Sequence, residues 1–218
     1  CYNSDKSVLI GQNAGKMLGV AGSNVAVGPF TVGGCAAASG GTGASNVAIG
    51  YAAGSALEDG GCNVFLGWCA GALSKDNHNN VAIGKGAALN VTSGATNVFI
   101  GREVACKHTT GSCNIAIGYL AGRGASSSGG TGHNNIALGC YALSEQLTSG
   151  TQNIAIGAAA GICIADGHAN INIGYLAGCA NTDALCNIAI GYAAGSMNGT
   201  GDHNVYLGTD AGKSDTTS

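Results

Sequence analysis

The chain has 218 residues, a net charge of −3, only 9% charged residues, and 40 glycines against a single proline. No apolar run approaches the roughly 18–20 residues that a membrane-spanning helix needs, and the single proline without a G-x-y register excludes collagen. Lysines and arginines are scattered singly and form no basic stripe. We therefore expect neither membrane insertion nor a nucleic-acid partner.

A repeat of 17 residues runs along the chain, and its most regular phrase is N-[VI]-A-I-G. We number the asparagine of this phrase position zero. The twelve copies begin at Ser7, Asn24, Asn46, Asn63, Asn80, Asn97, Asn114, Asn135, Asn153, Asn170, Asn187 and Asn204. Extra residues, numbering five, four and one, precede three of these copies. Such a period is the signature of a solenoid in which each repeat contacts its neighbours.

Positions one to three predict a short strand in every copy. Position one is always Val or Ile, position three is Ile, Leu or Val, and position two is usually Ala. This alternation has the period of a strand with one buried face. The predicted strands are residues 8–10, 25–27, 47–49, 64–66, 81–83, 98–100, 115–117, 136–138, 154–156, 171–173, 188–190 and 205–207. We expect the Val and Ile side chains to face the interior as apolar ladders.

Two further columns flank each strand. The position-zero asparagines are predicted to stack, with their amides hydrogen-bonded from rung to rung. This ladder comprises Asn24, Asn46, Asn63, Asn80, Asn97, Asn114, Asn135, Asn153, Asn170, Asn187 and Asn204. A glycine at position four of all twelve copies predicts a bend that a Cβ would obstruct. These bend glycines are Gly11, Gly28, Gly50, Gly67, Gly84, Gly101, Gly118, Gly139, Gly157, Gly174, Gly191 and Gly208.

The rest of each copy divides into two segments. Positions five to eight often read Y-x-A-G, as in residues 51–54 and 119–122, and predict a second short strand. Alanine at position seven indicates close approach of another strand or chain. Positions nine to sixteen are polar and variable, and the longer insertions, around residues 33–45 and 123–134, fall there. Length variation confined to one arc is typical of an outward loop.

These columns predict an all-β fold, a parallel β-solenoid of about twelve 17-residue rungs. The whole of residues 1–218 forms one repeat domain, and residues 213–218 form a polar tail outside the repeat. Each rung depends on its neighbours, because a single 17-residue coil cannot bury enough apolar surface to offset its loss of conformational entropy.

The strings N-I-A-I-G-Y-L-A-G at residues 114–122 and N-I-A-I-G-Y-A-A-G at residues 187–195 resemble two related groups. One is the head repeat of YadA-like trimeric autotransporter adhesins. The other is the repeat-rich tail-fibre and surface-fibre proteins of phages and large viruses. The resemblance implies a left-handed β-roll, usually trimeric in the adhesin heads, that works in attachment. The present unit is longer than the typical adhesin unit, and its cysteines are unusual in those heads.

Ten cysteines are an even number, which is common in oxidised extracellular proteins. Two pairs occupy positions nine and sixteen of their rungs and bracket the variable arc. These candidate disulfides are Cys106 with Cys113 and Cys179 with Cys186. A bridge there would restrict the unfolded chain.

The other cysteines have less obvious partners. Cys62 and Cys69 flank a strand and lie about 20 Å apart if it is extended, so we expect no bridge unless the bend at Gly67 folds the chain back. Cys1, Cys35, Cys140 and Cys163 have no partner within a rung. They either pair between rungs or chains or stay as small buried thiols.

No sequence pattern indicates enzymatic chemistry. No C-x-x-C, G-x-S-x-G, H-E-x-x-H or P-loop occurs, and the aspartates fall in the loops of different rungs. We expect no catalytic, metal or cofactor site. The five histidines lie in the variable arc and are interpreted as solvated. Asn90 and Asn198 begin N-x-T sequons and are candidate glycosylation sites.

We interpret the chain as a non-enzymatic, self-assembling subunit or shaft segment of an extracellular or virion fibre. Its partners would be copies of itself, in a homotrimer or a filament. The alternative is an adhesin whose loops 33–45 and 123–134 bind a cell-surface glycan or receptor. Ice binding is a minor alternative, since it normally needs a regular threonine array. Because the sequence begins at Cys1, we expect either a removed leader or a segment of a longer protein.

Overall fold

The computed structural model describes residues 6–16, 22–33, 43–124, 129–144, 149–180, 182–197 and 199–213. Every strand in them has three residues. They are β1 Val8–Ile10, β2 Val25–Val27, β3 Val47–Ile49, β4 Val64–Leu66, β5 Val81–Ile83, β6 Val98–Ile100, β7 Ile115–Ile117, β8 Ile136–Leu138, β9 Ile154–Ile156, β10 Ile171–Ile173, β11 Ile188–Ile190 and β12 Val205–Leu207. These bounds are the predicted ones, and the described residues contain no helix.

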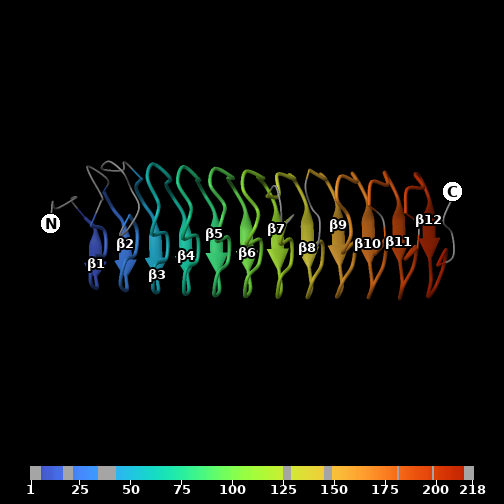
Figure 1. The fold of residues 1–218 in the computed structure, drawn as a ribbon, viewed down its shortest axis with the longest axis horizontal. Helices are drawn as coiled ribbons and strands as arrows, with labels where there is room; N and C mark the ends of the chain where they lie inside the picture. Colours follow the sequence, from blue (N-terminus) through green and yellow to red (C-terminus); the bar gives the residue numbers. More distant parts are fainter. Residues whose placement is uncertain are drawn as a thin grey trace. The chain divides into compact units, whose positions relative to one another are not determined.

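The chain divides into two compact units, Cys1–Thr110 with β1 to β6 and Gly111–Ser218 with β7 to β12. Within each unit the strands lie side by side and run in the same direction (Figure 1). Neighbouring strands pair in parallel with equivalent positions opposite each other. The structure confirms the predicted parallel β-solenoid with its 17-residue rungs. The left-handedness implied by the resemblance stays a prediction.

The insertions leave the strand register unchanged. Val25 pairs with Val47 across a separation of 22 residues, and Ile115 pairs with Ile136 across 21. The extra residues are therefore accommodated in the arc that leads from one strand to the next, as the length variation predicts.

The prediction that positions one and three face the interior is wrong. From β2 to β12 every strand buries its position-two residue and leaves positions one and three partly or fully exposed. In β3, for example, Ala48 is 0% exposed and Ile49 is 42% exposed. The interior opposite position two is narrow in the rungs that carry alanine there. A Cβ added to Gly122, which faces β7 from the turn of its own rung, would lie 3.1 Å from the Cβ of Ala116.

Two large side chains enter this interior beside glycines at position eight. Phe65 takes position two of β4 and is completely buried. A Cβ on Gly54 or Gly71 would lie 2.9 or 2.6 Å from its ring atoms. Tyr206 of β12 stands in the same relation to Gly195, where a Cβ would lie 2.6 Å from the ring. At these two strands the missing Cβ at position eight leaves room for the ring, whereas Phe99 of β6 is buried although position eight carries Ala88 and Ala105.

The predicted second strand at positions five to eight is a turn in the structure. Its position-six residues have positive φ, for example 52° at Ala52 and 53° at Cys69, which a strand does not allow. The turns still hydrogen-bond from rung to rung, as the amide of Gly54 does to the carbonyl of Ala70 at 2.9 Å. The position-seven alanines are buried and pack inside the rung. Their small size therefore does not mark an approach of another chain.

Candidate functional site

The position-zero asparagines form a buried, hydrogen-bonded ladder within each unit. In the first unit, the backbone amide of Asn46 and its Nδ2 both donate to Oδ1 of Asn24, at 2.9 and 3.1 Å. In the second, Asn170 makes the same two bonds to Asn153, at 3.0 and 3.1 Å. In rungs of regular length the Nδ2 also donates to the carbonyl fourteen residues later, so Asn46 reaches Gly60 at 2.9 Å and Asn170 reaches Ala184 at 2.7 Å. Each asparagine side chain therefore links neighbouring rungs and holds the arc of its own rung close to the strand.

The bend glycines occupy a backbone conformation that other residues avoid. Their φ angles lie between 120° at Gly208 and 141° at Gly101. A Cβ on Gly50 would lie 2.5 Å from the carbonyl oxygen of Gly67, the equivalent residue one rung further. Both the strained φ and the backbone contact exclude a side chain here. The asparagine ladder and the bend glycines therefore stabilise the fold. Candidate functional groups are found among the exposed side chains.

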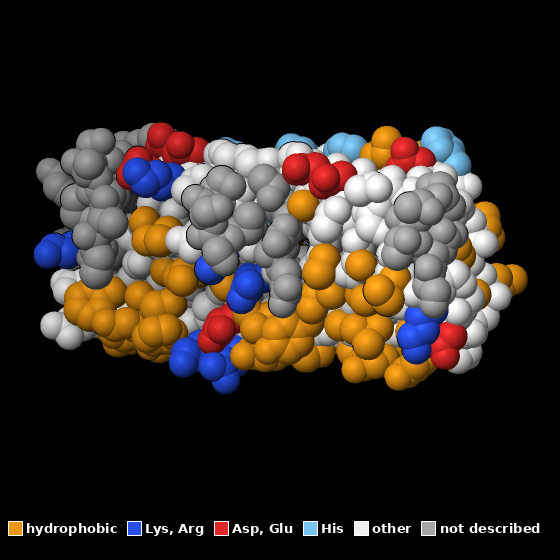
Figure 2. All heavy atoms as spheres, turned by 45° about the vertical axis from the view of Figure 1, so that its right-hand side comes forward, with side chains coloured by type: hydrophobic (Ala, Val, Ile, Leu, Met, Phe, Trp, Pro, Cys, Tyr) orange, Lys and Arg blue, Asp and Glu red, His pale blue; other side chains and the backbone are white. Residues whose placement is uncertain are grey.

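The most extensive exposed feature is the outward strand face, which we define as the side chains at strand positions one and three. Every one of these residues is Val, Ile or Leu. Ile49 and Ile156 are about two-fifths exposed, and neither lies on the first or last strand of its unit. Figure 2 shows hydrophobic side chains gathered along the lower part of the view, with histidines at the upper edge. Large side chains that are normally buried therefore face solvent in every rung.

An aromatic column runs beside the outward strand face, at positions five and six. The rings of Tyr51 and Trp68 stack at 6.1 Å with an interplanar angle of 13°, and the Lys85 Nζ lies 5.1 Å from the Trp68 ring centroid. Tyr175 and Tyr192 stack at 5.4 Å and 27° in the second unit. Stacked rings cover each other's faces and leave their edges exposed. They extend the apolar surface but offer little ring face to a sugar.

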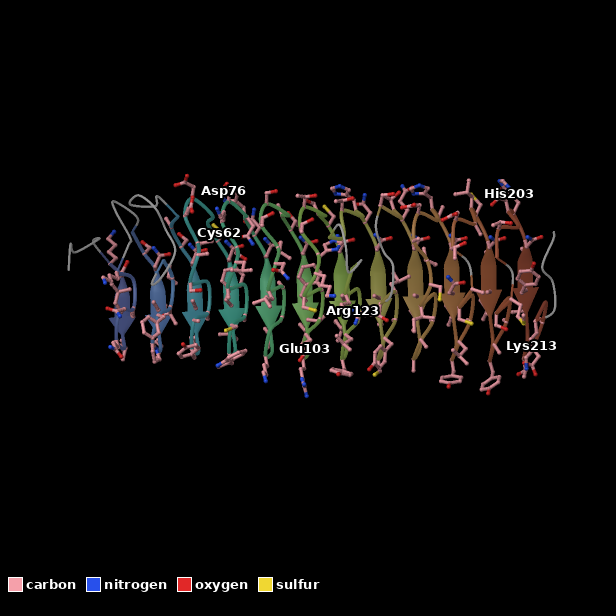
Figure 3. The ribbon with its side chains drawn as sticks, viewed as in Figure 1. Cys62, Asp76, Glu103, Arg123, His203 and Lys213 are labelled. Atoms are coloured by element: carbon pink, nitrogen blue, oxygen red, sulfur yellow. The ribbon has the colours of Figure 1, made fainter. Side chains whose placement is uncertain are left out.

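In the first unit, charged residues interrupt the aromatic column. Position five is Lys85 in one rung and Arg102 in the next. The Nε of Arg102 lies 3.1 Å from Oε1 of Glu103, and this pair is exposed. Figure 3 shows Glu103 beyond one end of the strands and Asp76 beyond the other, on the arc. An exposed ion pair of this kind contributes little to the free energy of unfolding. Its main effect is to place charged groups in the aromatic column.

Tyr119 and Tyr141 make a second contact in the aromatic column of the second unit. Their ring centroids are 5.4 Å apart at an interplanar angle of 82°. A hydrogen bond to Tyr119 raises the pKa of the Tyr141 hydroxyl above its usual value. The Tyr141 hydroxyl therefore keeps its proton near pH 7.

The structure shows all eight cysteines of its described residues as thiols. Cys179 is half-buried, its Sγ lies 3.3 Å from the carbonyl oxygen of Ser196 in the next rung, and burial raises the pKa of its thiol. Cys186 is exposed, and the candidate bridge between the two is not formed in this structure. Cys106 and Cys113 belong to different units, so their pairing stays a prediction.

Cys69 is half-buried beside the aromatic column. Burial raises the pKa of its thiol, and the positive charge of Lys85 opposes that rise. Cys62 is exposed on the arc side of β4. Cys1 and Cys35 lie outside the described residues.

The histidines differ among themselves. His78, His133, His168 and His203 are exposed on the arc, as interpreted from the sequence. The Nδ1 of His78 accepts a hydrogen bond from the Gly61 amide at 3.0 Å. His108 departs from the interpretation, because it is 1% exposed and packs edge-on against Phe99 at 6.0 Å. The His108 ring packs beside Phe99, a large residue at position two. Its polar neighbours in the sequence gave no indication that it is buried.

Parts of both predicted loops and one sequon residue fall outside the described residues. Residues 34–42 of loop 33–45 and residues 125–128 of loop 123–134 lie outside them, as does the sequon residue Asn198. Asn90, the other sequon residue, is half-buried, and its Nδ2 donates to the Cys106 carbonyl. A glycan on this nitrogen would replace that contact between rungs.

Comparisons with known proteins assign no function to this surface. Among the described residues no group of three or more His, Cys, Asp or Glu side chains could hold a metal ion. In the same residues no helix is long and apolar enough to cross a membrane. No protein-family model matches the chain, and neither curated proteins nor solved structures give a significant match.

Proposed function

We propose that the chain is a non-enzymatic structural subunit that associates with copies of itself through the outward strand face. In this proposal it forms a shaft segment of a fibre on a cell or virion surface. The exposed Val, Ile and Leu side chains of the strands are the observation that supports it. Monomeric soluble proteins rarely leave contiguous apolar patches of more than a few hundred Å² open to water.

The shape and chemistry of this face favour a copy of the chain as the partner. The face belongs to a parallel, in-register sheet, so it repeats the same apolar side chains at every rung. Two or three identical faces can therefore interdigitate along their lengths, as the inner faces of packed sheets do. Fully burying one Val or Ile side chain contributes about 1.5–3 kcal/mol, and the repeated contribution can offset the entropy lost on association.

The extracellular or virion setting and an attachment role have a different basis. They come from the resemblance of the N-I-A-I-G-Y repeats to adhesin heads and fibre proteins. Attachment through the loops 33–45 and 123–134 remains the alternative within the same assembly, since the sequence places both insertions between strands.

The proposal is tested by placing charge on the outward strand face. We expect the double variant Ile49→Lys and Ile156→Lys to sediment as a smaller species than the parent chain at equal concentration. A matched control, Ser93→Lys with Thr200→Lys, adds the same charge at exposed positions of the arc and should leave the assembly intact. Far-UV circular dichroism checks that all three proteins are folded. A parent chain that sediments as a monomer at high concentration would refute the proposal.

A further inference from the structure

Cys163 and Cys179 lie opposite each other on neighbouring rungs of the second unit. Cys163 is position ten of the rung that begins at Asn153, and Cys179 is position nine of the next rung. The backbone amide of Cys163 donates to the carbonyl oxygen of Cys179 at 3.3 Å, and both residues are half-buried. A disulfide needs Cα atoms about 4.4–6.8 Å apart, and hydrogen-bonded neighbouring strands lie about 4.7–4.9 Å apart.

The side chain at position ten can reach position nine of the following rung. Asn90 shows this in the first unit, where it occupies position ten and its Nδ2 donates at 2.6 Å to the carbonyl of Cys106, which occupies position nine. Cys163 stands in the same relation to Cys179. The Cys179 Sγ now contacts Ser196 on the far side, so rotation about χ1 to another staggered rotamer is needed to turn it toward Cys163.

We propose that Cys163 and Cys179 form a disulfide that links adjacent rungs under oxidising conditions. The oxidant is a low-molecular-weight disulfide such as oxidised glutathione. One protein thiol loses its proton, and the thiolate attacks a glutathione sulfur and expels one glutathione thiolate. The second protein thiolate then attacks the mixed disulfide and expels the other glutathione. Two protein thiols are oxidised and one glutathione disulfide is reduced to two thiols.

This bond excludes the bridge that the sequence predicts within one rung, because Cys179 has a single sulfur. A bond to Cys163 fastens one rung to the next, whereas a bond to Cys186 would close the arc of one rung. Asp166 lies between Cys163 and Cys179, and Asp183 lies between Cys179 and Cys186. Cleavage before these aspartates puts the three cysteines on different peptides, so the two bridges give different joined peptides.

The test uses the full folded chain, incubated with oxidised glutathione at a pH of about 8.5, where a thiolate is available, and then alkylated. Cleavage after Lys and Arg and before Asp yields peptides 124–165, 166–182 and 183–201. They contain Cys140 with Cys163, Cys179, and Cys186 respectively. We expect 124–165 joined to 166–182 in a protein of monomer mass on a non-reducing gel run in denaturant.

Single variants identify the sulfurs involved. The joined peptide should disappear in Cys163→Ala and in Cys179→Ala and persist in the matched controls Cys140→Ala and Cys186→Ala. Peptide 166–182 joined to 183–201, peptide 166–182 recovered alkylated, or a joined peptide found only in a covalent dimer would each overturn the proposal. If a variant does not fold, the parent digest still separates these outcomes, and fragmentation of the joined peptide between Cys140 and Cys163 shows which of the two is linked.

Discussion

The two faces of each strand differ in a way that reverses the usual arrangement of a soluble protein. In β3, the inner face presents Ala48, which is completely buried, while the outer face presents Val47 and Ile49. In this strand the larger apolar side chains are outside and the smallest is inside. The inner face therefore serves the close stacking of a thin coil, and the outer face has apolar surface to offer a partner. Substitutions on the two faces should have different consequences, which the following experiments measure.

The largest loss of stability is expected at a bend glycine, where the inner face ends. In Gly157→Ala a Cβ would lie 2.6 Å from the Gly174 carbonyl oxygen, at a φ of 132°. We expect the free energy of unfolding to fall by about 3–5 kcal/mol, measured by chemical denaturation. Gly199→Ala is a suitable control, since a Cβ there meets nothing within 4 Å and the residue lacks this positive φ. Equal losses in both variants would contradict the prediction.

A smaller loss is expected in the asparagine ladder on the same inner side. Asn153→Ala removes the acceptor of the Asn170 amide at 3.0 Å and the donor to the Gly167 carbonyl at 2.7 Å. These groups are buried, so leaving them unpaired should cost about 2–4 kcal/mol. Denaturant titration measures the loss. A change within error of the parent protein would mean that water replaces the lost partners.

A gain of stability is expected at Asn172, a polar residue on the otherwise apolar inner face. Asn172 occupies position two of β10, is completely buried, and has no hydrogen-bond partner for Oδ1 or Nδ2. Its neighbours in register are Ala155 and Ala189. Asn172→Ala removes an unpaired buried amide and should raise the free energy of unfolding by about 1 kcal/mol. A rise in the thermal midpoint checks this, and a fall would show that the amide fills space that alanine leaves empty.

The smallest change in stability is expected on the outer face. Ile49→Thr keeps the β-branch and the strand propensity, and Ile49 is already 42% exposed. We expect the unfolding free energy of the dissociated chain to change by less than about 1 kcal/mol, while self-association weakens. Sedimentation measures the association, and denaturation at low concentration measures the stability. A large loss of stability in the monomer would assign the residue to the core.

The positions of the strands could be predicted from the sequence, but their orientation could not. Alternation at residues 47–49 shows that positions one and three share a face, and both Ala and Ile are apolar enough to be inside. The choice depends on the width of the coil, which follows from tertiary packing of the rungs. Hydrophobicity ranks Ile above Ala and therefore favoured the wrong face.

Two other differences have equally local causes. Ala52 and Cys69 adopt positive φ at position six, although neither residue type favours that region. Nothing in such residues distinguishes a turn from a strand. The ladder's second acceptor, the carbonyl fourteen residues later, also could not be predicted, because the path of the arc back to Asn46 depends on the folded rung.

Because the strand register stays constant across the insertions, equivalent positions on the arc recur at a fixed spacing. Equivalent positions on successive rungs are separated by the spacing of paired strands, about 4.8 Å, however many residues intervene. The exposed residues Cys62, Asn79 and Thr96 each precede a ladder asparagine in the first unit. Labels attached at these three positions would be held in a line at steps of one rung. The repeat thus supplies a series of attachment points whose spacing is set by the backbone rather than by the side chains they carry.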